Sequence, residues 1–122
     1  MSYFRILVLF LVSAVFAAAH LFFLRTYLYW EYDLLDVGMH IWGGVLIVAA
    51  WYEVSSLWRG RFTSPYASLV VLLTLALVWE VFKYLIGGTV ADNYAVDTAT
   101  DILAGLGGGL AAFYLYRSRT IG

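Results

Sequence analysis

The sequence has no cysteine, only one proline and few charged residues. Without cysteine, the chain can form no disulfide bond, no cysteine-ligated iron–sulfur cluster and no thiol nucleophile. Charged side chains make up 12% of the chain, about half their usual share in a soluble domain. No low-complexity tract or internal repeat is found either. The scarcity of charge argues against a soluble globular protein.

Long apolar runs are present instead, in a chain that is 64% hydrophobic with a mean hydropathy of +0.87. A helix that crosses a bilayer needs roughly 20 mostly apolar residues. Four segments meet this length, at about residues 6–24, 34–52, 66–86 and 98–116. The connectors between them are short and polar, and the one proline lies in the second connector. The sequence therefore predicts an all-α protein: a single domain, residues 1–122, that forms a four-helix transmembrane bundle.

The first span resembles a secretory signal, since an apolar run follows Arg5 and small residues at 17–19 imitate a cleavage site. The apolar chain continues past that site to Leu24. We therefore expect this segment to be kept as a membrane helix.

The arginines predict the orientation of the bundle, because cytoplasmic ends of spans collect Lys and Arg. With both termini inside, the cytoplasmic side holds five arginines and only one acid, Glu53. The outer side then holds Arg25 and Lys83 together with seven of the eight acidic residues. We expect both termini in the cytoplasm, the functional face outside, and a location in the bacterial inner membrane.

Ionisable residues occur in three of the four predicted spans at a similar depth from the outer side. Asp36 and His40 begin the second span four residues apart, and this spacing places both side chains on one helix face. Asp97 and Asp101 have the same spacing at the start of the fourth span. Glu80 lies about six residues before the outer end of the third span, or about 9 Å along its axis.

Acidic side chains inside a span cost several kcal/mol unless they are paired or hydrated, and they commonly mark functional sites. Several carboxylates brought together must share protons, pair with a basic group or bind a metal ion. Oxygen ligands with one imidazole favour magnesium, manganese, iron or zinc. The candidate catalytic residues are Asp36, His40, Glu80, Asp97 and Asp101, and the candidate metal ligands are Asp36, His40, Glu80 and Asp101.

Some of these polar residues also have a structural interpretation. Asp97, which precedes Thr98, could cap the fourth helix. Lys83 follows Glu80 by three residues, a spacing typical of an ion pair within one helix. His20 is interpreted as a hydrogen-bonded contact between helices. The pair Asp92 and Asn93 is typical of a turn.

Glycines follow the acidic turns of the second and fourth spans. Gly43 and Gly44 come after His40, and Gly105 is followed by three glycines at 107–109. Small residues at such spacings let membrane helices approach closely, so we expect these two spans to pack against each other. Alternatively, the GxxxG match at 105–109 is a dimerisation face. Aromatic residues, 19% of the chain, are expected mainly in the interfacial belts, although an outer lid over the site is an alternative role for them.

Three motifs, "YDLLDVGMHIWGG", "WEVFKYLIGG" and "NYAVDTATDILAGLGGG", resemble those of small bacterial VanZ-like and YjdF-like membrane proteins. The similarity covers about residues 32–110. It matches the families' leading Asp with Asp36 or Asp33, their His with His40, their Glu with Glu80, and their final acidic pair with Asp97 and Asp101. VanZ-like proteins are associated with glycopeptide resistance. The Lys directly after the leading Asp, and the Gln and Arg common in VanZ, are missing here, which favours the YjdF-like side.

Three functions are compatible with these patterns. One is an outward-facing site that binds a divalent cation and acts on a lipid-linked or cell-envelope substrate, with Glu80 or His40 as general base. Another is a non-catalytic accessory subunit of a larger membrane complex or a homo-oligomer. A third is a proton- or cation-coupled transport module. We expect membrane lipid as a partner and no nucleic acid.

Overall fold

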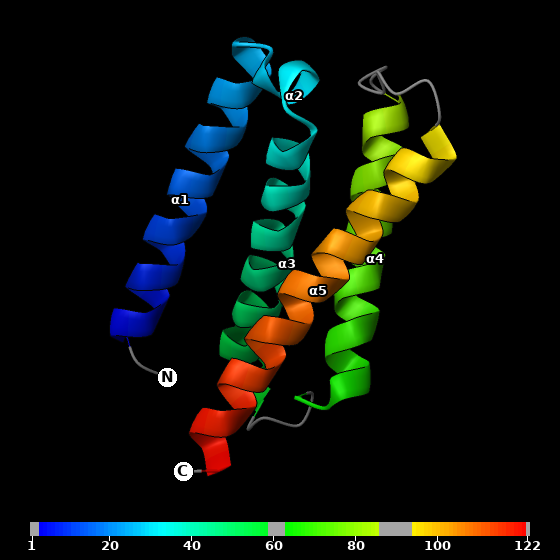
Figure 1. Cartoon of the computed structure of the whole chain (residues 1–122). Helices are drawn as coiled ribbons and strands as arrows, with labels where there is room; N and C mark the ends of the chain where they lie inside the picture. The colour runs from blue at the N-terminus through cyan, green and yellow to red at the C-terminus, as the bar shows by residue number, and fades with distance from the viewer. Residues whose placement is uncertain (1–2, 59–62, 86–93, 122) are drawn as a thin grey trace.

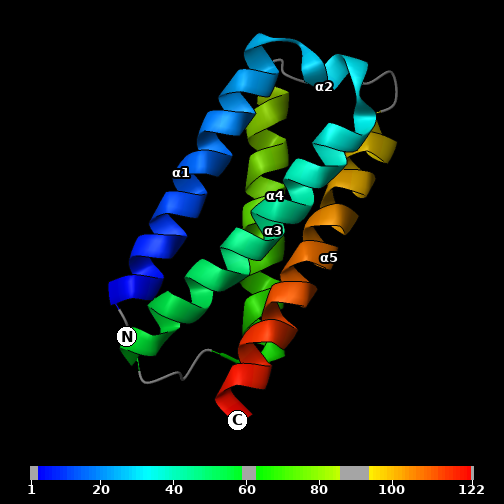
Figure 2. The ribbon, with the colours of Figure 1, turned by 60° about the vertical axis from the view of Figure 1, so that its left-hand side comes forward.

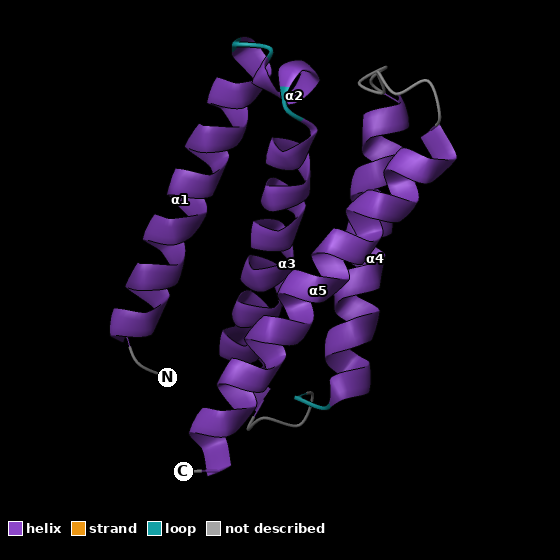
Figure 3. Cartoon of the chain, viewed as in Figure 1, coloured by secondary structure: helices purple, strands orange, loops and turns teal. Residues whose placement is uncertain are grey.

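The computed structural model describes residues 3–58, 63–85 and 94–121. Within these ranges the chain forms four long α-helices, a short α-helix and one turn of 3-10 helix, without any strand (Figures 1 and 3). The long helices are α1 (Tyr3–Arg25), α3 (Asp33–Ser55), α4 (Pro65–Leu85) and α5 (Tyr94–Ile121). All four are long and apolar enough to cross a membrane. The predicted all-α fold of four transmembrane helices is confirmed.

Two differences from the sequence prediction bear on the site. The short helix α2 (Leu28–Glu31) lies in the first connector, which we expected to be a loop. Helix α5 begins at Tyr94, four residues before the predicted start of the fourth span. Asp97 therefore lies in the first turn of α5 and is not its N-cap. A carboxylate there still interacts favourably with the positive end of the helix dipole.

Local sequence signals explain where α4 starts. Pro65 is the first residue of α4, a position where its missing N–H group leaves no hydrogen bond unmade. The preceding Ser64 caps the helix, since its Oγ accepts a hydrogen bond from the Ala67 N–H at 3.1 Å. After α3, residues Ser56–Trp58 form the 3-10 turn η1.

Some of the predicted features lie outside the described residues. These are the arginines at 59 and 61, the Asp92–Asn93 turn and the predicted end of the third span at 86.

Both termini lie at one end of the bundle, and α2 lies at the other, which we call the distal end (Figure 1). The closest packing joins α3 and α5, as the two views in Figures 1 and 2 agree. Their contact, together with α4, buries a small core of Val48, Leu72, Ala112 and Phe113. In the described part of the chain, the backbone of α1 lies close only to α3 and α2, and α1 contains no buried residue.

Glycines allow the close approach of α3 and α5, as the sequence predicted, although not every predicted glycine takes part. A Cβ atom at Gly44 would overlap the backbone carbonyl of Gly105, and one at Gly108 would overlap the carbonyl of Ile41. Gly43 instead faces α1, where a Cβ atom would lie 3.6 Å from the Phe16 ring. The α3–α5 contact therefore depends on Gly44 and Gly108, and Gly43 belongs to a different interface.

Large apolar side chains cover the outside of the bundle, and many of them are more than half exposed within the isolated chain. Such a surface fits a hydrocarbon environment, in which exposed apolar groups cost nothing. The protein is therefore a multi-pass membrane protein by the length and composition of its helices.

Candidate functional site

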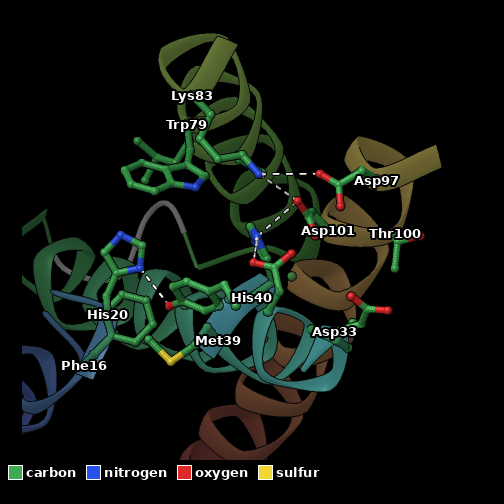
Figure 4. Close-up of a pocket in the computed structure, with 18 of the residues that line it drawn as sticks. Phe16, His20, Asp33, Met39, His40, Trp79, Lys83, Asp97, Thr100 and Asp101 are labelled. Atoms are coloured by element: carbon green, nitrogen blue, oxygen red, sulfur yellow. Dashed lines mark hydrogen bonds and ion pairs between the residues drawn. The ribbon is translucent and has the colours of Figure 1, made fainter. Parts of the chain in front are cut away.

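Six polar residues from three helices meet near the distal end, and we call them the distal cluster. Helix α3 supplies Asp36 and His40, α4 supplies Glu80 and Lys83, and α5 supplies Asp97 and Asp101. The close packing of α3 and α5 below this level brings their polar turns together. Figure 4 shows most of these side chains pointing toward one another.

His40 lies between two carboxylates. Its Nε2 atom is 3.6 Å from Asp36 Oδ1 and 3.2 Å from Asp101 Oδ2. One contact is within α3, as the four-residue spacing predicted, and the other crosses to α5 (Figure 4). A hydrogen on Nε2 can be donated to Asp101, with Asp36 nearby, and a metal ion could replace that hydrogen.

Lys83 joins the acidic residues of α4 and α5. Its Nζ donates a hydrogen bond to Asp101 Oδ2 at 2.9 Å and lies 3.2 Å from Glu80 Oε1. Asp97 Oδ2 is farther away, at 4.0 Å. The predicted Glu80–Lys83 ion pair is present, and Lys83 also pairs with Asp101, one of the ways in which the buried carboxylates were expected to be compensated. Only the packing of α4 on α5 makes that contact.

Burial differs sharply within the distal cluster. Asp101 and Glu80 are almost completely buried, at 2% and 3% exposed, whereas the side chains of Asp36 and Asp97 are each 33% exposed. A buried carboxylate must be compensated by a positive group or hydrogen bonds. Asp101 has both Lys83 and His40; Glu80 has Lys83 and a hydrogen bond from Thr98 Oγ1 at 3.4 Å.

Three of the four predicted metal ligands can reach one point. Single ligand atoms of Asp36, His40 and Asp101 all lie within 4.8 Å of one another. Tetrahedral metal–ligand bonds of about 2.1 Å place ligand atoms about 3.4 Å apart, so the most distant pair would have to approach by up to about 1.4 Å to close the site. Glu80, the fourth predicted ligand, is not in this group and faces Lys83 instead.

A cavity of about 890 Å³ adjoins the distal cluster. Its polar wall contains Asp33 and five members of the cluster, Asp36, His40, Lys83, Asp97 and Asp101. Glu80 is not among the lining residues. A molecule in the cavity could therefore contact every predicted site residue except Glu80.

Aromatic residues cover the side of the cavity next to α1 and α2. His20 Nδ1 is hydrogen bonded to the Tyr29 hydroxyl at 2.9 Å (Figure 4). The His20 and Trp79 rings also meet edge to face, with their centroids 5.7 Å apart. This confirms His20 as a contact between helices. Burial, together with the nearby charge of Asp36, raises the pKa of Tyr29 to about 12. We expected the aromatic segment 27–32 mainly to anchor the bundle at the membrane interface, with an outer lid over the site as the alternative; Tyr29 and Trp30 of this segment line the cavity.

Comparisons with protein-family models, with curated proteins and with solved structures found no match for this chain.

Proposed function

We propose that this protein is a bacterial cytoplasmic-membrane protein whose distal cluster binds a divalent cation and acts on a lipid-linked or cell-envelope substrate. The observation that carries the proposal is the convergence of Asp36, His40 and Asp101 at the wall of a cavity. Two carboxylates and one imidazole suit magnesium, manganese, iron or zinc. The resemblance to VanZ-like and YjdF-like proteins remains a prediction and supplies the bacterial location.

The residues around the three ligands have distinct parts in this proposal. Lys83 holds Asp101 in position and compensates the charge of Glu80, as an outer partner of a metal ligand does. A divalent ion there would polarise a substrate oxygen or activate a bound water. Asp97 lines the cavity and is partly exposed, so it replaces Glu80 as the candidate general base.

A second candidate function is that of an accessory subunit in which the distal cluster only stabilises the bundle. The ion pair of Lys83 with Asp101 favours it, because this pair joins α4 to α5 without any ligand. A transport path has less support. The cavity lining ends toward the termini at apolar residues such as Ile47 and Leu72, and does not include Glu53.

Ion binding by purified protein separates these functions. After metal depletion, titration of wild-type protein with Mn²⁺ or Zn²⁺ should show one site per chain. Saturation at 100 times the Kd should raise the free energy of unfolding by about 2.7 kcal/mol. Asp101→Asn keeps the size and hydrogen-bonding capacity of the side chain but removes its charge. It should weaken ion binding by a factor of about 10 to 100 or more.

Asp33→Asn is the matched control, since Asp33 lines the cavity but lies outside the three-ligand group. It should leave ion affinity unchanged. If the distal cluster only stabilises the fold, wild-type protein should bind no ion. Asp101→Asn should then lower the melting temperature only slightly, whereas Asp101→Leu should lower it strongly. That pattern would contradict the proposed cation site.

A further inference from the structure

The cavity has a second, apolar arm that the proposed cation site does not use. Phe16, Gly43, Ile47, Leu72, Leu75 and Ala76 line this arm. It runs along α3 from His40 to Ile47, seven residues or about 10 Å along the helix axis. The cavity is therefore amphipathic, with carboxylates at its distal end and hydrocarbon side chains deeper in the membrane.

The apolar arm lies between α1 and α4, whose backbones do not approach each other closely in the described part of the chain. The ring contact of His20 with Trp79 joins these two helices near the distal end. Farther from the distal end than this contact, α1 packs on α3 through the rings of Phe16 and Trp42, which meet edge to face with their centroids 5.4 Å apart. We therefore infer that the side of the cavity between α1 and α4 opens toward the hydrocarbon layer.

The surroundings decide what fills such an arm. Water would find no hydrogen-bond partners among these apolar side chains, whereas a lipid chain would form van der Waals contacts with them. The volume of about 890 Å³ falls in the range of roughly 300 to 1,000 Å³ found for small-molecule sites. A hydrocarbon chain gains no hydrophobic energy on moving from the bilayer into the arm. Any selectivity must therefore come from the head group.

The polar end of the cavity favours a positively charged head group. Asp33, Asp36 and Asp97 lie at this end and are at least one-third exposed, and the neighbouring rings of Tyr29 and Trp30 also line it. Carboxylates pair with an ammonium group, and aromatic faces attract a cation. The only lysine on the lining, Lys83, already contacts Asp101 and Glu80.

We propose that the cavity binds one membrane lipid, with a hydrocarbon chain in the apolar arm and an amine-bearing head group at Asp33 and Asp97. The inference deepens the proposed function by naming the substrate class of the same site, and it rests on that function only in treating the lipid as a substrate. Binding of the lipid itself requires no metal ion.

Lipid retention by the full chain in mild detergent tests the proposal. Protein is incubated with equal amounts of phosphatidylethanolamine and phosphatidylglycerol with identical acyl chains, and the bound lipid is identified by native mass spectrometry. Wild-type protein should retain one phosphatidylethanolamine per chain, preferred about tenfold over phosphatidylglycerol. The double variant Asp33→Asn/Asp97→Asn should retain both lipids equally.

A pair of adjacent substitutions on α4 tests the apolar arm. Ala76→Trp places a ring inside the arm, whereas Leu77→Trp places the same ring at an exposed position outside the cavity. Ala76→Trp should lower lipid retention about tenfold or more, and Leu77→Trp should leave lipid retention unchanged. If Ala76→Trp does not fold, the smaller Ala76→Leu should show the same direction. No retained lipid, equal retention by Ala76→Trp and wild type, or no head-group preference would each overturn the inference.

Metal analysis of the same samples keeps the two proposals apart. If the lipid binds as expected but wild-type protein binds no divalent ion, the cation site fails and the lipid site stands. If ion binding depends on Asp101 but Ala76→Trp retains lipid like wild type, the lipid site fails and the cation site stands.

Discussion

Lys83 shows how one side chain can change the chemistry of a whole group of carboxylates. Asp36, Glu80, Asp97 and Asp101 would repel one another in a medium of low dielectric constant. Lys83 contacts the two most buried of them, so the deep part of the distal cluster is compensated by the protein itself. Asp36 and Asp97, which are more exposed, retain an excess of negative charge toward the cavity. This division explains why a cation or a cationic head group would bind on the cavity side.

Tyr29 gives a prediction for pH at the scale of a single residue. Its pKa is raised from 10.0 to about 12, first by burial and then by the charge of Asp36. The folded protein therefore holds the phenolic proton more tightly than the unfolded chain does. The stabilisation that results is fully present below pH 10 and is lost as the pH rises from 10 through about 12.

Thermal unfolding of wild-type protein and Tyr29→Phe between pH 8 and pH 12 measures this effect. The difference in melting temperature should be constant up to about pH 10 and should shrink above it. Phenylalanine keeps the ring but cannot titrate or bond to His20. A difference that is independent of pH up to 12 would contradict the raised pKa.

At the scale of elements, the contact between α3 and α5 determines where the distal cluster forms. Gly44 and Gly108 place the two backbones in contact below the polar turns, so that Asp36 and His40 face Asp101. The contact lies inside one chain, which supports the intramolecular interpretation of the glycine-rich segment over the dimerisation face.

Two adjacent glycines on α5 provide a matched test of this contact. Gly107→Ala adds a Cβ atom that meets nothing within 4 Å, whereas the same atom in Gly108→Ala would overlap the Ile41 carbonyl. Both changes raise helix propensity equally, by up to about 1 kcal/mol. Gly107→Ala should thus be neutral or stabilising, and Gly108→Ala should lower the free energy of unfolding by roughly 1–3 kcal/mol, as overpacking does.

Unfolding of the two variants in mixed detergent micelles measures the difference. Gly108→Ala should also weaken ion binding, because it separates Asp101 from Asp36 and His40. Equal stability of the two variants would show that the helices adjust without cost and that glycine at 108 is not required.

At the scale of the whole molecule, the distribution of charge predicts which end of the bundle is outside. The structure places both termini at one end and α2 at the other. The excess of arginine near the termini predicts that this end is cytoplasmic. Under that topology the cavity and the distal cluster open toward the outer side of the membrane.

Single cysteines can test the topology without background, because the chain has none of its own. Thr26→Cys, at the exposed end of α1 next to α2, should react with a membrane-impermeant maleimide in intact cells. Ser118→Cys, exposed near the end of α5, should react only after the membrane is permeabilised. The reverse pattern would move the distal cluster to the cytoplasmic side.

The sequence by itself determined the fold class, the four spans and the candidate residues. An apolar run of about 20 residues crosses a bilayer as a helix, which satisfies its own backbone polar groups, and acids within such a run are costly enough to stand out. Equal spacing also determined that Asp36 and His40 share one helix face, and that Asp97 and Asp101 share another. These are local properties, which depend on the chain over one or two turns.

Only the tertiary structure decided how the candidates are grouped. It placed Asp101 next to His40 and Lys83, directed Glu80 toward Lys83 and away from the cavity, and brought His20, Tyr29 and Trp79 together. It also assigned Gly43 to α1 and Gly44 to α5. These outcomes depend on the rotation of each helix about its axis and on its neighbours. In a membrane, packing and polar contacts between helices determine both, and periodicity in a single apolar span does not reveal them.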